Sequence, residues 1–197
     1  MTKLSNADGS PVDGTDARQL SDAEVLGRKQ IIEFFSFLRS YAPGFEKSYL
    51  LEIAPQVGVR ETRRVLGDYQ LIEKDVLDCA SFDDSIGVNS WMIEEHVAGN
   101  IKFKWQDIPN CRGFNHLPYR MLLPKGQHNL MVAGRCASMT HGGQSAARVS
   151  GACFVMGQAA GTAASLAVSQ NISLREVDTE NLQRNLTLAE AYLGLDK

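Results

Sequence analysis

The sequence predicts an α/β protein that forms either one ordinary domain or two incomplete lobes. Its 197 residues are 44% hydrophobic and 22% charged, which is typical of a globular chain and excludes a disordered, collagen-like or coiled-coil protein. Apolar side chains recur at helical spacing in residues 31–42, and apolar and basic side chains alternate in residues 101–105. A short apolar run at 129–133 then leads through a glycine into a long helical pattern, which is a strand-to-helix order.

The charge balance and the cysteine pattern limit the partners and the compartment. A net charge of −3 gives no electrostatic case for nucleic acid or a membrane as the partner. Residues 1–19 lack an apolar segment, so we expect no signal peptide and a cytoplasmic location. The cysteines and histidines show neither C-x-x-C pairs nor metal-ligand spacing, which predicts reduced thiols and no metal site. The four cysteines are Cys79, Cys111, Cys136 and Cys153.

The N-terminal part predicts a leader followed by a helix. Residues 1–19 are rich in Ser, Asp, Gly, Thr and Asn, so we expect a mobile leader. Ser21 and Glu24 have the spacing of a capping box, which starts a helix, and Pro43 stops it. Its apolar positions lie on one face, so we expect this helix to pack on a sheet. They are Ile31, Phe34, Phe35, Leu38, Tyr41 and Ala42.

The middle of the chain has residue patterns that predict strands. We expect strands within residues 49–54, 57–60 and 69–72, and a half-buried strand near a sheet edge at 101–105. Arg60, Arg63 and Arg64 lie between the second and third of these strands. If two of the three arginines face a cleft, they can hold a carboxylate. The alternative is that they lie on a solvated strand edge and have no function in binding.

The C-terminal part begins with an extended segment at 117–124. The apolar run 129–133 predicts a strand buried on both faces, as in a parallel sheet. We expect a loop at 135–145, a long helix from 146–148 to 170, and a last helix that Asp178 or Thr179 caps. Within the long helix Gly157 and Gly161 form a stripe of small residues, which calls for close packing rather than a membrane span.

The start of the long helix is the strongest candidate for chemistry. Its unpaired amides carry about half a positive charge. Arg148 adds a full charge there, so an anion or a group that becomes anionic on reduction suits the place. A plain strand–helix unit with an exposed first turn is the alternative interpretation.

Several segments, in this order, resemble the FAD-dependent oxidoreductase family, a group of flavoproteins with two dinucleotide folds. The resemblance spans about residues 20–193. The matching segments are residues 20–44, with Gly27-Arg28 and Phe37-Leu38-Arg39; residues 58–69, GVRETRRVLGDY; residues 117–120, LPYR; residues 129–138, NLMVAGRCAS; Arg148-Val149; and residues 156–164, MGQAAGTAA.

The resemblance implies a substrate lobe at 20–117 and, at 118–197, the C-terminal part of a Rossmann-like FAD-binding lobe. Members of the family begin with a G-x-G-x-x-G turn that grips the FAD pyrophosphate. This sequence has no such turn, since Gly9, Gly14, Gly27 and Gly44 are isolated. We therefore expect a missing half, a partner subunit that supplies it, or a homo-oligomer. The alternatives are a non-catalytic binding or scaffold domain and a pseudoenzyme fragment.

The resemblance also implies the reaction and the residues at the cofactor. A hydride would pass between a small organic substrate and the flavin of FAD. Gly134 and Arg135 would lie beside the ribityl chain or the pyrophosphate. The helix start would face the pyrimidine edge of the flavin and stabilise the reduced ring. That helix start consists of Ala147, Arg148, Val149 and Ser150.

Three more side chains are candidates for work on the substrate. Arg60 and Arg63 would hold a carboxylate. His141, in the glycine-rich loop at the expected flavin face, is the acid–base candidate, although a lone loop histidine is more often incidental. Cys136 is either a redox thiol near the flavin or a buried structural cysteine.

Overall fold

A computed structural model describes residues 4–97, 100–107 and 110–195 of the chain. By its contacts the chain divides into an N-terminal unit, Met1–Thr62 with Ala98–Asn100, and a main unit, Arg63–Val97 with Ile101–Lys197. The predicted lobes, which meet at residues 117 and 118, are defined by their roles toward FAD and substrate. This division by contact does not test them, and they stay a prediction.

The N-terminal unit contains helix α1, Ala17–Tyr41, which begins earlier than expected. Asp16 caps the helix, since its carboxylate accepts from the amides of Arg18 and Gln19. Ser21 lies inside the helix, where its hydroxyl donates to the carbonyl of Ala17. The predicted capping box at Ser21 is therefore wrong, because an acidic cap upstream starts the helix first. The end of the helix before Pro43 is confirmed.

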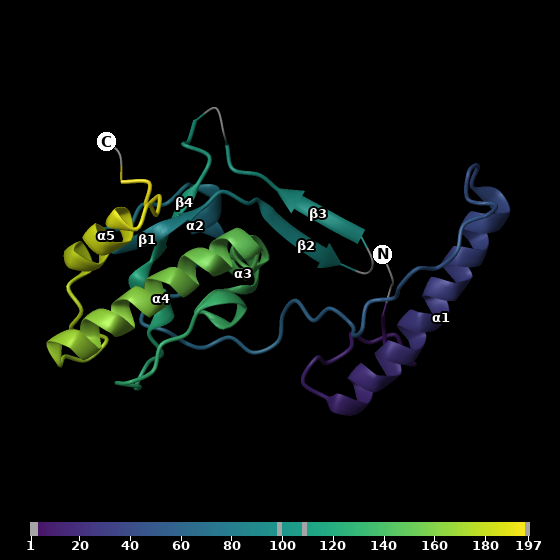
Figure 1. The fold of residues 1–197 in the computed structure, drawn as a ribbon, viewed down its shortest axis with the longest axis horizontal. Helices are drawn as coiled ribbons and strands as arrows, with labels where there is room; N and C mark the ends of the chain where they lie inside the picture. Colours follow the sequence, from purple (N-terminus) through teal and green to yellow (C-terminus); the bar gives the residue numbers. More distant parts are fainter. Residues whose placement is uncertain (1–3, 98–99, 108–109, 196–197) are drawn as a thin grey trace. The chain divides into compact units, whose positions relative to one another are not determined.

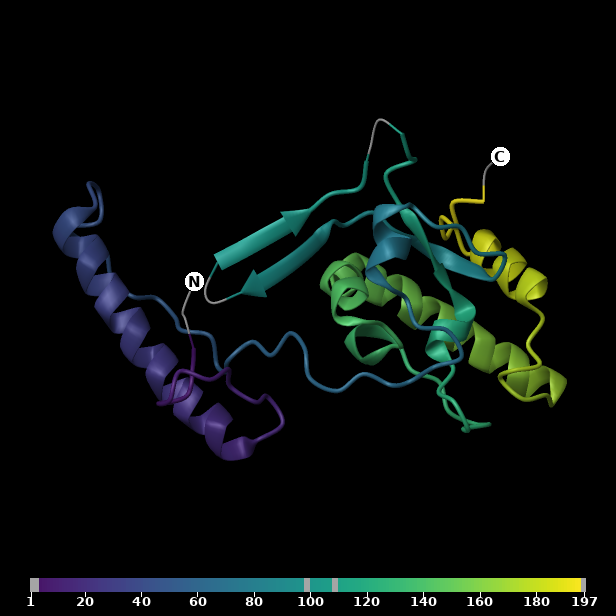
Figure 2. The ribbon, with the colours of Figure 1, turned by 180° about the vertical axis from the view of Figure 1, so that it is seen from behind.

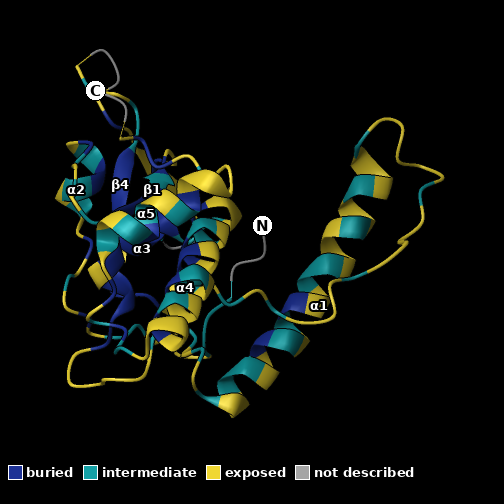
Figure 3. Ribbon diagram, turned by 60° about the vertical axis from the view of Figure 1, so that its left-hand side comes forward, coloured by how far each residue is buried: buried dark blue, intermediate teal, exposed yellow. Residues whose placement is uncertain are grey.

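The apolar face of α1 is open within its own unit. Phe34 is 61% exposed, Phe37 53% and Tyr41 75%, while Ala23 and Gly27 are the helix residues that are buried. The described part of this unit forms no sheet apart from the end of β3 at Asn100. Within its own unit α1 therefore packs on no described sheet, so packing of this helix on a sheet stays a prediction, and Figure 3 shows how little of α1 is buried.

The described part of the predicted leader folds against α1. The side-chain amide of Asn6 donates to the side-chain oxygen of Gln19 over 2.9 Å. A Cβ placed on Gly27 would lie 3.6 Å from the side chain of Leu4. The mobility of this leader stays a prediction, and residues 1–3 lie outside the described residues.

The main unit is built around one antiparallel strand pair with helices against it. Strand β1, Ser85–Asn89, pairs with β4, Asn115–Pro118, with Val88 opposite His116. Helix α4, Ser150–Gln170, contacts β1 and also packs on α5, Thr179–Leu188 (Figure 1). The side chains that fill the core between them are fully buried. The largest include Ile86, Leu117, Met121, Leu122, Met156, Leu182 and Leu186.

Three of the predicted strands in the first half of the chain do not form. Residues 49–54 and 57–60 are irregular, and residues 69–72 contribute one isolated parallel bridge, from Leu71 to Met139. The predicted strand at 129–133 is also irregular, and the amide of Val132 donates to the carbonyl of Leu122. A buried parallel strand needs a strand on each side. The described residues offer 129–133 no such neighbours, which explains the failure.

The predicted strand at 101–105 is confirmed in position. Strand β3, Asn100–Lys104, pairs with β2, Ile93–Val97, in a separate two-stranded hairpin that Figure 2 shows from behind. The expected half-burial is wrong, because every residue of β3 is exposed, including Phe103 at 50%. Helix α3, described below, packs on β2, where Ile93 is buried, but the apolar alternation of β3 has no core to meet.

Two helices replace the predicted loop and single long helix. Helix α3, His141–Ala147, begins at the Thr140 cap, and α4 begins again at Ser150 after a break. Gly143 lets α3 lie against the backbone, since a Cβ there would be 2.3 Å from the carbonyl oxygen of Leu71, just before α2, Glu73–Leu77. The last predicted helix is confirmed as α5 with Asp178 as its cap.

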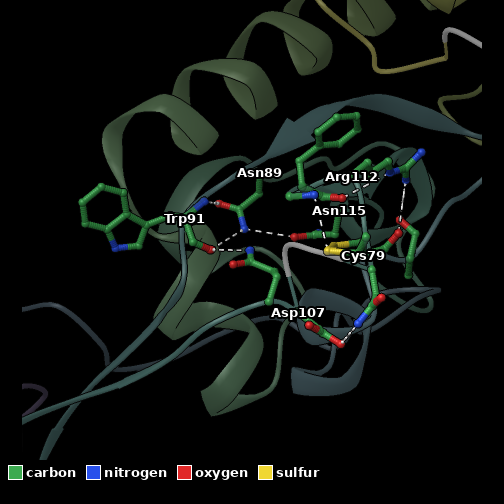
Figure 4. The surroundings of a disulfide bond; sticks show 12 residues. Cys79, Asn89, Trp91, Asp107, Arg112 and Asn115 are labelled. Carbon is green, nitrogen blue, oxygen red and sulfur yellow. Dashed lines mark hydrogen bonds between the residues drawn. A yellow bond between two sulfur atoms is a disulfide. The ribbon is translucent and has the colours of Figure 1, made fainter.

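Cys79 and Cys111 form a disulfide, which corrects the prediction that all four thiols are reduced. The two cysteines are separated by 32 positions in sequence. The antiparallel pairing of β1 with β4 brings them together, because the amide of His116 donates to the carbonyl of Ala80. The guanidinium of Arg112 donates to the carbonyl of Cys79 in the same place (Figure 4).

Helix α4 is long and apolar enough to cross a membrane by length and composition alone. This is weak evidence, because a core helix passes the same test. One face of α4 is buried against the core of the main unit, through Ala152, Met156 and Ala163 among others. The opposite face, with Phe154 and Val168, is exposed (Figure 3).

Candidate functional site

The structure brings the two predicted cofactor segments together at the start of α4. The short 3-10 turn η2, Gly134–Cys136, contacts α4. Gly134 has a φ of +78°, which favours glycine. A Cβ built on Gly134 would lie 3.7 Å from the sulfur of Cys153 in the first turn of α4. The backbone of residues 134–136 therefore runs beside the helix start that sequence analysis singled out.

Arg148 is fixed at the break between α3 and α4. Its guanidinium donates to the main-chain carbonyl of Glu94 on β2 over 3.1 Å. Its own carbonyl accepts from the thiol of Cys153 over 3.3 Å. Arg148 and Val149 are half-buried, Ala147 is buried, and Ser150 is exposed. The positive side chain is thus tied to the hairpin, while the helix start beside it faces outward.

The start of α4 has the chemistry of an anion site. Val149 is the N-cap, and no side chain caps the first amides in the described structure. A 21-residue helix with uncapped amides presents partial positive charge at its N-terminus. Arg135 and Arg148 stand on the two segments that meet here, so the place suits a phosphate, a carboxylate or an anionic ring.

Two thiols lie at the same place. Cys136 is exposed, so its interpretation as a buried structural cysteine is wrong. Cys153 is partly buried, and this burial raises the pKa of its thiol. The charge of Arg135 lowers that pKa and Cys136 raises it, but both effects are smaller than that of burial. The sequence gives Cys136 no near neighbour, but the fold brings Cys153 within electrostatic reach of it.

A cluster on β2 surrounds the carbonyl that holds Arg148. The carboxylate of Glu94 accepts from the ring Nε2 of His96 over 2.7 Å and from the indole Nε1 of Trp91 over 3.3 Å. The side chains of His96 and Glu94 are 18% and 24% exposed. Burial raises the pKa of Glu94, but the hydrogen bonds from His96 and Trp91 and the charges of His96 and Arg148 outweigh it and hold that pKa below its usual range.

Sequence reasoning missed this cluster. It set His96 aside because no cysteine stands at ligand spacing from it. Period-two alternation was the available signal, because residues 94 and 96 of one strand share a face. That signal names a carboxylate–imidazole pair but does not show that Arg148 lies beside it.

The remaining predicted site residues are not gathered at this place by the described contacts. His141 is exposed at the first residue of α3, about 10 Å along that helix from Arg148. Arg60 is exposed in the N-terminal unit and Arg63 is exposed in the main unit, so their joint role on a substrate stays a prediction.

One arginine near the predicted lobe junction has a structural role. The guanidinium of Arg120 lies 3.3 Å from the carboxylate of Asp84 and stacks over the rings of Tyr69 and Phe82. Its neighbour Tyr119 is buried, and the phenol donates to the carbonyl of Leu174 over 2.7 Å. These contacts join residues 69–84 and residue 174 to the 3-10 turn η1, Tyr119–Leu122.

The uncapped helix start, with arginines on both segments that meet there, has the chemistry of a site for an anionic cofactor. The family model for FAD-dependent oxidoreductases matches residues 2–186, so the chain belongs to that family. No curated protein and no solved structure matches the chain.

Membership of the family makes FAD the cofactor and redox chemistry the general function. The residues at the start of α4 fit one edge of FAD, since uncapped amides and two arginines offer donors to an anionic group. The sequence contains no G-x-G-x-x-G turn for the pyrophosphate.

Proposed function

We propose that the chain supplies the reaction-side part of a flavoprotein that transfers a hydride between a small organic acid and FAD. The observation that carries the proposal is the meeting of Gly134 and Arg135 with the uncapped start of α4 at Arg148 and Ser150. Bound FAD would supply the hydride-accepting ring. Arg148 and the amides after it would face the edge of that ring where negative charge develops on reduction.

The substrate roles follow the sequence predictions. Arg60 and Arg63 would hold the carboxylate of the acid, since a guanidinium pairs with a carboxylate through two parallel hydrogen bonds. His141 is the sequence-based candidate for proton transfer. These roles are proposals about residues that lie in different units of the chain.

We also propose a partner that completes the FAD-binding lobe, either a second polypeptide or a further segment with the G-x-G-x-x-G turn. Two features of the main unit support this. The exposed face of α4 carries Phe154 at 76% and Val168 at 83% exposure, and nothing lies within 4 Å of a Cβ placed on Gly157 or Gly161. Residues 129–133 are apolar but have no strand beside them among the residues that the structure describes. A Rossmann-like lobe would cover both features.

A non-catalytic binding or scaffold domain is the rival function. The observation that favours it is that the described residues contain two small antiparallel sheets and no parallel dinucleotide-binding sheet. A cytoplasmic location is likewise a proposal. The disulfide between Cys79 and Cys111 weighs against it, because disulfides persist mainly in oxidising compartments.

The proposal is tested by titrating FAD into the protein, alone and with the partner, and following the flavin fluorescence. Replacing Arg148→Gln removes one charge-assisted contact, which predicts an FAD dissociation constant about 10- to 100-fold higher. Arg184→Gln, at an exposed position of α5, is the matched control and leaves the constant unchanged. Equal constants for Arg148→Gln and the parent protein would contradict the assigned site.

A further inference from the structure

The pair Glu94–His96 has the arrangement of a general base and the group that orients it. Ring Nε2 of His96 lies 2.7 Å from the Glu94 carboxylate, which only accepts hydrogen bonds while ionised. The neutral ring must therefore carry its hydrogen on Nε2. This leaves Nδ1 with a lone pair that can take a proton.

Ring atom Nδ1 of His96 lacks a partner in the protein. It is buried and makes no hydrogen bond to any residue that the structure describes. Buried polar atoms in folded proteins are nearly always paired, so an orphan calls for a partner from outside. A hydroxyl or amine hydrogen of a substrate is such a partner.

The pair is also joined to the candidate cofactor site. Arg148, which we place at the flavin, donates to the main-chain carbonyl of the same Glu94 whose side chain holds His96. The pair lies on β2, which packs against α3, and the side chains of His96 and Glu94 are 18% and 24% exposed, so a small movement would open Nδ1 to a substrate. His141, the sequence-based candidate, instead stands exposed at the first residue of α3.

We propose that His96 is the proton-transfer residue of the oxidoreductase and that Glu94 orients its ring. This deepens the proposed function and rests on it. The substrate is an acid whose reacting carbon carries an O–H or N–H group. The carbon–hydrogen bond breaks with its electron pair, and that hydride goes to FAD. The O–H or N–H bond also breaks. Its proton binds Nδ1 of His96, and its electrons become the second bond of the new C=O or C=N group.

The charges around the pair suit this role. On the same strand Glu95 accepts from Lys104 of β3, which also binds Glu73 of α2, so these charges are paired with one another. The carboxylate of Glu94 is left to stabilise the imidazolium that forms when Nδ1 takes the proton. The charge of Arg148 also lowers the pKa of that carboxylate, by less than the hydrogen bonds from His96 and Trp91 do.

A first test needs neither FAD nor substrate. Long-range proton–nitrogen NMR at a pH where His96 is neutral shows which ring nitrogen carries the hydrogen, with His96→Gln to assign the signal. We expect hydrogen on Nε2 and a bare Nδ1 in the parent protein. Glu94→Gln should give a mixture of both forms, because an amide can donate as well as accept. Hydrogen on Nδ1, or a mixture in the parent protein, would overturn the proposal.

The second test uses the FAD-loaded protein, with its partner where one is needed, and lactate and alanine as probe substrates. His96→Gln keeps a donor for Glu94 but cannot take a proton. It should slow flavin reduction by about 100-fold while the flavin bands remain. His128→Gln, an exposed histidine outside the site, is the control. Flavin reduction by His96→Gln at the parent rate would overturn the role of His96. Loss of flavin from the parent protein would instead count against the proposed function.

Discussion

Gly143 gives the sharpest prediction about how the site is supported. It lies in α3, whose C-cap is Arg148, and a Cβ at this position would be 2.3 Å from the carbonyl oxygen and 2.9 Å from the carbonyl carbon of Leu71. Ordinary van der Waals contact begins near 3.4 Å, so Gly143→Ala requires a shift of about 1 Å. Leu71 cannot move freely, because its amide donates to Ser138 and its carbonyl accepts from Thr140.

The change in the free energy of unfolding of Gly143→Ala is the difference between a gain in helix propensity and a cost of overpacking. Alanine gains about 1 kcal/mol over glycine in a helix interior. Overpacking against a fixed backbone costs about 1–3 kcal/mol, and each strained backbone hydrogen bond adds about 1 kcal/mol. We therefore expect Gly143→Ala to lower the free energy of unfolding by about 2 kcal/mol.

Gly157→Ala is the matched control, because nothing lies within 4 Å of its added methyl group. It should raise the free energy of unfolding by about 1 kcal/mol through helix propensity alone. Urea unfolding followed by circular dichroism measures both variants. A Gly143→Ala protein as stable as the parent would refute the close seating of α3 on the residues before α2.

Three further predictions concern the core, the disulfide and pH. Met156→Ala should lower the free energy of unfolding, measured in urea, by about 2–5 kcal/mol. Phe154→Ala, at an exposed position, is the control and should change it by less than about 0.5 kcal/mol. Similar losses for the two variants would mean that α4 buries a different face. Reducing the Cys79–Cys111 disulfide opens a loop of 32 positions and should lower the free energy of unfolding by about 4 kcal/mol. Alkylation of both cysteines in the unfolded protein without a reductant would contradict the disulfide. Burial raises the pKa of Tyr119 from 10.0 to about 12, so its contribution to stability is full below pH 10 and is lost as the pH rises toward 12. Tyr119→Phe should therefore show a smaller loss of stability over that pH range, and an unchanged loss would show that other groups cause it.

The parts of the fold that local physics decides were predictable from the sequence. The position of α5 follows from Asp178 and a run of apolar residues at helical spacing, and the end of α1 follows from Pro43. Strand β3 was predictable from its alternation. The strand predicted at 129–133 was not, because an apolar run becomes a buried strand only where other strands flank it.

The candidate site shows the same division. The sequence singles out Gly134, Arg135 and the residues around Arg148, and the structure brings these segments together. The sequence does not show that β2 lies beside Arg148, because Glu94 and Arg148 are 54 positions apart and meet only in the fold. The disulfide was missed for the same reason, since Cys79 and Cys111 approach only when β1 pairs with β4.

The central claim is that this chain forms one side of an FAD site. The most direct test is the visible absorption spectrum of the protein, expressed with its native genomic neighbours, purified and desalted. We predict flavin bands that survive desalting and that weaken when Arg148 is replaced by glutamine. A protein that stays colourless after incubation with FAD, with every co-purifying partner present, would contradict the claim.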